Sequence, residues 1–386
     1  MRIGFDAKRA YHNQTGLGHY SRTLIRSLAT NYPEHSYWLM NPRPSKQFHF
    51  QDLSNVTEVL PQDWLSKGFP ALWRSSWMNK DLQRLELDLY HGLSHELPAG
   101  IAITGIPSVV TMHDLIFERY PDQYKRADRM IYRYKFQQAC KEADRIIAIS
   151  RQTKDDLVEL YGVPESKIDV CYQSCNPAFA QPVSEEEKLR VRNLYQLPEQ
   201  FFLYVGSIIE RKNLLNICKA MTVLSNDVPF PLVIIGGGGA YKQQVQEFIL
   251  QHQLDDRCIF LSDQTAARNS TGFQTAADFP AIYQQALAMI YPSFYEGFGI
   301  PVLEGLWSGI PVITSNSSCL PEAGGAGAFY VNPGSPEEIA QQMKSVVTDP
   351  FLVQSHFEKT KQHLVQFTNQ ATAARVMDVY RNLLQR

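Results

Sequence analysis

The sequence has no excess of charge of either sign and no long hydrophobic run. Its 386 residues include 37 Lys and Arg against 39 Asp and Glu, a formal net charge of −2. Proteins that bind nucleic acid need a clearly basic surface, so nucleic acid is excluded as the main partner. No stretch of about 18 apolar residues is present, so the sequence predicts no transmembrane helix.

Cysteine is scarce and shows no ligand spacing. Of the six cysteines only Cys171 and Cys175 lie close together in the chain, and they form neither a disulfide framework nor a zinc motif. We therefore expect free buried thiols, no bound metal and no cofactor. The N-terminus enters a strand pattern at once, without the apolar stretch of a secretion signal. We expect a cytoplasmic protein, with peripheral contact at the inner face of the membrane as an option.

The chain does contain a regular alternation of short apolar runs and helical stretches. This alternation predicts an α/β fold, with parallel sheets covered by helices on both faces. In the first half the predicted strands are Arg2–Phe5, Tyr37–Leu39, Leu87–Tyr90, Ser108–Met112, Arg145–Ile149 and Ile168–Cys171. In the second half they are Phe202–Val205, Leu232–Ile235, Cys258–Phe260, Met289–Tyr291, Val312–Thr314 and Ala328–Tyr330.

The length is roughly two and a half times the ~150 residues of a typical domain, which predicts two doubly wound domains. A boundary is expected near residue 178, because Pro177 and Pro182 interrupt the periodicity and Ser184 begins a new helix. The predicted domains are residues 1–177 and 178–367, followed by an amphipathic helix over 368–386.

Open parallel sheets bind ligands beyond the carboxyl ends of their strands, so the residues after each strand are the candidates. After the first strand, Gly16-Leu17-Gly18 precedes a predicted helix over His19–Ala29 and lets the backbone approach an anion, although such a turn is often only a turn. It is not a dinucleotide fingerprint, because Ser21 stands where the third glycine belongs. His113 also follows a strand, and it either binds a hydroxyl or is a packed histidine bonded to backbone.

Two further candidate turns lie in the second half of the chain, one with two cationic residues and one with four glycines. Arg211 and Lys212 follow the turn at Gly206, and such a pair of cations suits a diphosphate unless it is merely solvated. Four consecutive glycines, 236–239, indicate a backbone that another group approaches closely, either a ligand or a neighbouring strand turn.

The strongest element is residues 292–305. Pro301 suits the start of a helix, so the Gly297-Phe298-Gly299 turn before it presents backbone N–H groups to a ligand. Glu296 and Glu304 flank this turn, and paired carboxylates suit a polyhydroxylated ligand.

At these residues the chain resembles glycosyltransferase family 4 over nearly its full length. That family contains retaining enzymes that use sugar nucleotides and fold as two facing Rossmann-like domains with a deep interdomain cleft, the GT-B architecture. The motifs that carry the resemblance are Gly16-Leu17-Gly18, His113-Asp114, Gly206 with Arg211-Lys212-Asn213, Glu296 to Glu304, and Ser315-Asn316 with Leu320-Pro321-Glu322.

The resemblance implies a role for each site residue. Glu304 would hold the nucleotide ribose, and Arg211 and Lys212 would hold the diphosphate. The remaining donor contacts would come from Gly16, Leu17, Gly206, Phe298 and Gly299, with Glu296 and His113 reaching the transferred sugar. Catalysis would then consist of positioning and of charge stabilisation on the departing diphosphate, without a metal.

Two departures from the family pattern stand out. Ser207 replaces an arginine that many members carry after the glycine matched by Gly206. The glycine-rich stretch 324–327 replaces a common acidic residue.

Within the family, the chain looks most like bacterial mannosyltransferases of surface-polysaccharide assembly, on the motifs at Thr15, His113-Asp114-Leu115 and Glu210. GDP-mannose is therefore the expected donor, and a UDP- or dTDP-sugar is the alternative. Two rival functions stay open: a non-hydrolysing sugar-nucleotide epimerase and a non-catalytic sugar-nucleotide-binding subunit.

The expected acceptor is a saccharide or a lipid-linked saccharide bound by the N-terminal domain. Two stretches there could contact sugar or lipid, although core packing for the first and a solvated face for the second are the more common explanations. Their residues are the aromatic set Trp64, Phe69, Trp73 and Trp77 and the basic set Lys125, Arg126, Arg129 and Arg133.

Overall fold

The computed structural model describes residues 1–45, 48–224 and 228–385. The chain divides into two compact units. Unit 1 comprises Met1–Ser174 and Gln366–Arg386, and unit 2 comprises Cys175–Val365. The sequence boundary near residue 178 lies beside this division, and Ser184 caps a new helix by accepting a hydrogen bond from the Glu187 amide.

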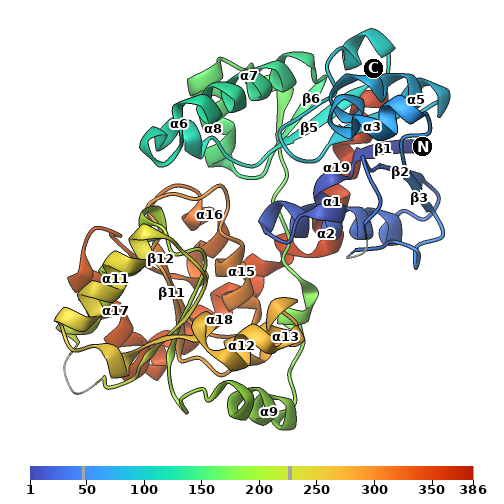
Figure 1. The fold of residues 1–386 in the computed structure, drawn as a ribbon. Coiled ribbons are helices and arrows are strands. Elements are labelled where there is room, and N and C mark those ends of the chain that lie inside the picture. The colour runs from blue at the N-terminus through green and yellow to red at the C-terminus, as the bar shows by residue number, and fades with distance from the viewer. Residues whose placement is uncertain (46–47, 225–227, 386) are drawn as a thin grey trace. The chain divides into compact units, whose positions relative to one another are not determined.

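Unit 1 is built on a fully parallel sheet of seven described strands in the order β3-β2-β1-β4-β5-β6-β7 (Figure 1). The strands are β1 (Arg2–Asp6), β2 (Ser36–Met40), β3 (Val56–Val59), β4 (Leu89–Gly92), β5 (Ser108–Met112), β6 (Arg145–Ala148) and β7 (Ile168–Val170). Its helices are α1 (Lys8–His12), α2 (Gly16–Asn31), α3 (Trp64–Gly68), α4 (Pro70–Leu72), α5 (Asn79–Arg84), α6 (Ile116–Arg119), α7 (Arg126–Glu142), α8 (Arg151–Tyr161) and α19 (Asn369–Leu384), with a π-helical turn η1 (Trp73–Trp77).

The sequence prediction of six strands for this half was wrong by one. The missed strand β3 lies at the sheet edge, and two of its four residues, Thr57 and Glu58, are exposed. Because the faces of β3 are not both covered, its sequence is not a continuous apolar run, and the sequence pattern did not predict it as a strand. The predicted strand at Leu87–Tyr90 also begins two residues later, at Leu89.

Unit 2 contains a second parallel sheet of six described strands in the order β10-β9-β8-β11-β12-β13. The strands are β8 (Phe202–Val205), β9 (Leu232–Ile235), β10 (Cys258–Phe260), β11 (Ala288–Tyr291), β12 (Val312–Ser315) and β13 (Phe329–Val331). Its helices are α9 (Glu185–Tyr195), α10 (Leu214–Val223), α11 (Ala240–Gln251), α12 (Thr265–Asn269), α13 (Thr271–Gln274), α14 (Phe279–Tyr283), α15 (Ile300–Trp307), α16 (Leu320–Gly324), α17 (Pro336–Thr348) and α18 (Pro350–Leu364).

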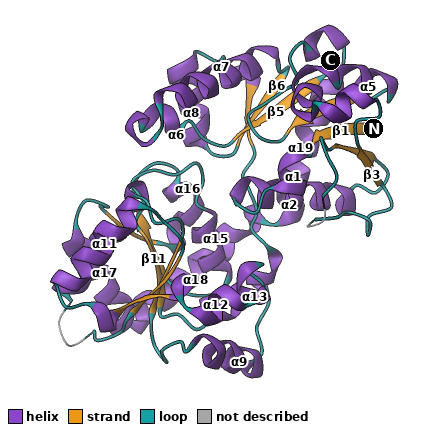
Figure 2. Ribbon diagram, viewed as in Figure 1, coloured by secondary structure: helices purple, strands orange, loops and turns teal. Residues whose placement is uncertain are grey.

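Each sheet has helices on both faces, as Figure 2 shows, and its inner strands contribute mostly apolar residues to the core. The strand order reverses between β1 and β4 in unit 1 and between β8 and β11 in unit 2. In doubly wound sheets such a reversal opens a space at the carboxyl ends of the two strands, where ligands bind.

The C-terminal helix α19 belongs to unit 1. Its buried side, which includes Val376, Met377 and Tyr380, packs into the same core as β1 and α2. The Tyr380 hydroxyl also lies 2.6 Å from Nδ1 of the buried His91. The chain therefore completes the core of unit 1 with residues from both of its ends.

The predicted free thiols are confirmed, because all six cysteines are buried and none forms a disulfide. In the described parts of the chain, no helix combines the length and the apolar character needed to span a bilayer.

Candidate functional site

Unit 2 brings Arg211, Lys212 and Glu296 together. Arg211 Nη1 lies 3.0 Å from Glu296 Oε2, and Lys212 Nζ lies 3.3 Å from Oε1. The two cations lie in the short turn η6 (Glu210–Lys212) that follows β8, and Glu296 follows β11. The cluster is therefore at the carboxyl ends of the two strands between which the strand order reverses.

Two cations share one carboxylate in this cluster, so it is positive overall. Burial alone would raise the pKa of Glu296, but the charges of Lys212 and Arg211 lower it to about 2. Glu296 is therefore ionised at neutral pH, and one positive charge of the three side chains is left over for an anion.

Tyr291 links the two sides of the cluster and was missed as a site residue by sequence reasoning. Its hydroxyl accepts a hydrogen bond from Lys212 Nζ at 2.6 Å and donates one to Glu296 Oε1 at 2.9 Å. Burial and the charge of Glu296 raise the pKa of Tyr291 well above its usual value, so the phenol keeps its proton. The available signal was a tyrosine as the last residue of an otherwise apolar strand.

Backbone contacts hold the cationic turn in place. Asn213 has a left-handed conformation, with φ of 65°, and its side-chain amide donates to the carbonyls of Pro292 and Pro333. The Phe294 amide donates to the Arg211 carbonyl at 2.9 Å. A Cβ on Gly206 would lie 3.2 Å from Lys212 Cδ, so the lysine side chain passes close to this glycine. These contacts fix the segments after β8 and β11 against each other.

The turn before α15 is also fixed by packing. Gly299 has φ of 110°, and a Cβ there would lie 2.8 Å from Leu320 Cδ2 on α16. The Cys319 thiol donates to the carbonyls of Glu296 and Phe298 at 3.0 and 3.1 Å. Pro301 stands in the first turn of α15, as predicted from the sequence. The amides of this turn lie at the start of a helix, where N–H groups have no intrahelical partner.

Glu304 lies on α15 and has an unusual protonation behaviour. The Tyr283 hydroxyl donates to its Oε2 at 2.8 Å. Burial raises the pKa of Glu304 to about 7, although this hydrogen bond and the charge of Lys212 act in the opposite direction. Tyr283, like Tyr291, was not singled out in the sequence, because both lie in apolar runs typical of core.

The glycine run 236–239 has a structural explanation at two of its positions. A Cβ on Gly236 would overlap the carbonyl oxygen of Gly206, and one on Gly238 would overlap that of Ile208. At Gly237 and Gly239 a Cβ would meet no described atom within 4 Å. The close approach expected from the sequence therefore comes from the segment after β8.

The glycine-rich stretch 324–327 is explained by helix packing. A Cβ on Gly325 would overlap the ring of His363, and one on Gly327 would overlap Thr360. Both of these residues lie on α18, which packs directly on the stretch. A larger side chain at Gly325 or Gly327 does not fit in this arrangement.

In unit 1, Gly16 and Leu17 form the first turn of α2, so the prediction of a separate turn before a helix at His19 was wrong. The Asn13 side chain accepts hydrogen bonds from the amides of Thr15 and Gly18. A Cβ on Gly18 would overlap the Asn13 carbonyl, whereas Gly16 has open space around it. Gly18 is thus required for packing, and Gly16 leaves the helix start accessible.

His113 follows β5 and is buried. Its Nε2 lies 2.9 Å from the carbonyl oxygen of Leu93 and its Nδ1 lies 3.4 Å from the side-chain amide of Gln173. Burial lowers its pKa to about 4, so the ring is neutral. These contacts match the packed-histidine alternative, and contact with a sugar stays a prediction.

The aromatic stretch of unit 1 is divided between core and surface. Trp73 is 1% exposed and its indole N–H donates to Asp81 at 2.8 Å, whereas Trp64 is 78% exposed. In the basic stretch, Arg133 is paired with Glu118. Among the described residues, no group of three or more His, Cys, Asp or Glu side chains is placed to hold a metal ion.

Comparison with known families covers both units. Residues 15–179 match the family described as Glycosyltransferase Family 4, and residues 185–364 match Glycosyl transferases group 1. The chain is 26% identical over 368 residues to O-antigen chain mannosyltransferase B of Escherichia coli, covering 90% of this chain and 91% of the relative. It is 28% identical over 237 residues to O-antigen chain mannosyltransferase RfbU of Salmonella typhimurium, covering 61% and 60%.

Solved structures share the whole fold. Anabaena HepE in complex with UDP superposes with a TM-score of 0.73 at 15% identity, over 99% of this chain and 100% of that chain. WaaG, a glycosyltransferase involved in lipopolysaccharide biosynthesis, superposes with a TM-score of 0.69 at 15% identity, over 98% and 99%. The fold is therefore GT-B, with two Rossmann-like units.

Proposed function

The chain belongs to the glycosyltransferases, with a family 4 domain followed by a group 1 domain, and we propose that it transfers mannose from GDP-mannose to a saccharide or lipid-linked saccharide. The observation that carries this proposal is the positive Arg211–Lys212–Glu296 cluster at the strand reversal of unit 2. Mannose is supported by relatives whose names give mannosyltransfer on O-antigen chains. The place of the reaction is polysaccharide or glycolipid assembly.

The donor would be held by unit 2 through complementary charge. Arg211 and Lys212 would bind the diphosphate, and Glu304 would accept hydrogen bonds from the ribose hydroxyls. Glu296 and the amides of Phe298 and Gly299 would bind hydroxyls of the transferred sugar. From unit 1 we propose the Gly16 and Leu17 amides for the diphosphate and His113 for the sugar.

The proposed reaction retains the configuration at the anomeric carbon. The acceptor oxygen forms a bond to the anomeric carbon on the face that the diphosphate leaves, and the bond from that carbon to the phosphate oxygen breaks. The acceptor proton passes to an oxygen of the departing diphosphate. Arg211 and Lys212 stabilise the charge that develops on the leaving group, which is the work a metal ion does in other enzymes.

A thermal-shift screen tests the donor half of this proposal. A ligand that binds the native state raises the melting temperature, so GDP is expected to stabilise the protein more than UDP, dTDP or ADP. Equal stabilisation by all four would contradict the choice of GDP. A transfer assay with GDP-mannose then separates the rival functions, because a transferase releases GDP only when an acceptor is added, whereas an epimerase changes the sugar without one.

Peripheral contact with an anionic membrane surface is a second part of the proposal. Trp64 on α3 and Phe69 between α3 and α4 are exposed, and so is Met130 on α7, next to the cationic Arg129. Apolar groups beside cations favour an anionic lipid surface. We expect cosedimentation with phosphatidylglycerol vesicles and little with phosphatidylcholine vesicles.

Paired variants test where such contact occurs. The double variant Trp64→Ala/Phe69→Ala is expected to lose most of the cosedimentation. Phe351→Ala, which removes an 89% exposed phenylalanine of unit 2, is expected to keep it. Equal binding by both variants would exclude α3 and α4 as the contact.

A further inference from the structure

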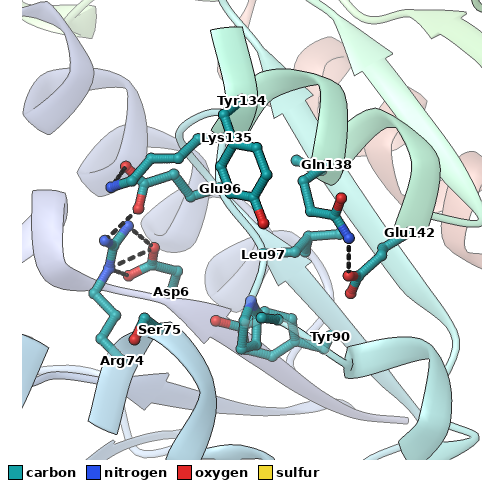
Figure 3. Close-up of a pocket in the computed structure, with 13 residues that line it drawn as sticks. Asp6, Arg74, Ser75, Tyr90, Glu96, Leu97, Tyr134, Lys135, Gln138 and Glu142 are labelled. Carbon is teal, nitrogen blue, oxygen red and sulfur yellow. Dashed lines mark hydrogen bonds and ion pairs between the residues drawn. The ribbon is translucent and has the colours of Figure 1, made fainter. Parts of the chain in front are cut away.

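Unit 1 has a cavity of about 180 Å³ at its own strand reversal. Asp6, at the end of β1, and Tyr90 on β4 line it from the sheet, and these are the two strands between which the order reverses. Arg74 from η1 closes one side, and Tyr134 and Gln138 from α7 close the other (Figure 3). Doubly wound sheets bind ligands at this position.

The charges in this cavity are arranged to repel an anion. Arg74 is held between two carboxylates, 2.5 Å from Asp6 and 2.6 Å from Glu96, and Lys135 is 3.2 Å from Glu96. With Glu142, three carboxylates face two cations. Burial opposes the charge of Arg74, but Asp6 and Glu96 raise its pKa, so the guanidinium keeps its charge and these two carboxylates offset it. Among the residues that line the cavity, each of the two cations is therefore paired with a carboxylate.

The remaining wall offers hydrogen-bonding groups and an aromatic face. Glu142 accepts bonds from the Gly100 amide at 3.0 Å and from Gln138 Nε2 at 2.5 Å. Two of its four lone-pair positions are thus left to accept further bonds. Figure 3 shows the Tyr134 ring over the space between the Arg74 group and the Gln138–Glu142 pair, and this tyrosine is 69% exposed.

The size of the cavity limits its occupant. Pockets for drug-sized ligands measure about 300–1,000 Å³, so about 180 Å³ suits a single ring rather than a nucleotide sugar. We propose that this cavity binds one neutral sugar ring, with Gln138 and Glu142 bonding its hydroxyls and Tyr134 stacking on its face. Resting on the proposed function, this assigns the cavity to the terminal sugar of an uncharged acceptor glycan.

The test is saturation-transfer NMR on the full chain with methyl α-D-mannopyranoside, methyl α-D-glucopyranoside, methyl α-D-galactopyranoside and inorganic phosphate as probes. At least one neutral glycoside is expected to bind, and phosphate is not expected to compete with it. Gln138→Ala should weaken that binding about fivefold, the value of one lost hydrogen bond. Gln137→Ala is the matched control, because Gln137 is the exposed neighbour on the same helix.

Tyr134→Ala serves as a second variant, because an exposed side chain can be removed without a loss of folding, and it should also weaken binding. Equal binding by the Gln138 and Gln137 variants, displacement by phosphate, or no binding of any glycoside would overturn the proposal.

GDP stabilisation measured on the same samples separates this proposal from the proposed function. If GDP binds and the glycosides do not, only this inference fails; if glycosides bind at Gln138 and no nucleoside diphosphate stabilises the protein, only the proposed function fails.

Discussion

The two units place a charged cluster at the same topological position but with opposite balance. In unit 1, beside β1 and β4, Arg74 is enclosed by Asp6 and Glu96. In unit 2, beside β8 and β11, Arg211 and Lys212 are both paired with Glu296. One cluster therefore suits a neutral polyhydroxylated ligand, and the other suits an anion.

The difference shows that the sheet topology and the local residues determine two separate properties, the position of a ligand site and the charge of its ligand. The reversal of strand order determines where a doubly wound sheet can bind a ligand. The ratio of carboxylates to cations at that position determines the charge of the ligand. A transferase that joins a charged donor to an uncharged acceptor needs both kinds of site.

The largest expected effect comes from removing the arginine of unit 1. Arg74→Ala leaves Asp6, 3% exposed, as a buried carboxylate without its guanidinium. We expect a loss of about 3–5 kcal/mol in the free energy of unfolding. Urea titration followed by tryptophan fluorescence measures it, because Trp38, Trp64, Trp73 and Trp77 all lie in unit 1.

The double variant Asp6→Asn/Arg74→Met is the control for this prediction, since it removes both charges together. It is expected to recover part of the lost stability. A cost below about 1 kcal/mol for Arg74→Ala would mean that water, not Arg74, solvates Asp6.

The corresponding change in unit 2 is expected to affect catalysis more than folding. Lys212→Ala leaves Glu296 paired with Arg211, so the fold is retained. The charge on a departing diphosphate would lose one partner, and we expect the transfer rate to fall about 10²- to 10³-fold. Lys188→Ala, which breaks an exposed pair with Glu185 in the same unit, should leave kcat/KM unchanged. Near-normal turnover of Lys212→Ala would reject its role on the leaving group.

Much of this comparison was visible in the sequence, because buried parallel strands are continuous apolar runs. Both sheets and the functional turns at Arg211 and Glu296 follow from such runs and the glycines beside them. The edge strand β3 was not visible, since its exposed Thr57 and Glu58 break the pattern. Sequence patterns detect burial, and an edge strand is buried only in part.

Residues that act through distant partners were harder to foresee. Arg74 meets Asp6 across 68 positions in the chain, and Lys212 meets Tyr291 across 79. Neither spacing follows a helical or strand period, so only the fold reveals the pair. The sequence likewise could not show that Arg74 lies between two carboxylates, or that Arg211 and Lys212 are paired with the same one.

Glu304 is expected to give the proposed donor site a pH dependence near neutrality. Its pKa of about 7 leaves it roughly one-tenth ionised at pH 6 and mostly ionised at pH 8. Only the ionised form accepts bonds from two ribose hydroxyls, so GDP affinity should rise by up to about tenfold over this range. Calorimetric titration with GDP at several pH values measures this rise for the wild type and for Glu304→Gln. The GDP affinity of the variant should rise less with pH, because the glutamine side chain does not titrate.

The same pKa fixes the sign of the effect on stability. The folded-state pKa of about 7 exceeds the ordinary value of 4.5, so Glu304 lowers the free energy of unfolding progressively as the pH rises from about 4.5 to about 7. The full loss persists above pH 7, and the group has no effect below pH 4.5. Glu304→Gln should therefore raise the melting temperature at pH 8 and leave it unchanged at pH 4. Identical pH profiles for the two proteins would contradict the burial of this carboxyl.

The smallest expected effect compares two tyrosines beside the two strand reversals. Tyr291 connects Lys212 to Glu296 through its hydroxyl, whereas the Tyr90 hydroxyl donates only to the weak acceptor Met78 Sδ at 3.5 Å. Tyr291→Phe removes a bond to each of two charged groups, so kcat/KM should fall about five- to tenfold. Tyr90→Phe should change kcat/KM for the donor, measured at saturating acceptor, by less than about twofold, because a thioether contact contributes little. Equal losses in both variants would mean that the hydroxyl of Tyr291 acts through packing and not through the orientation of Lys212.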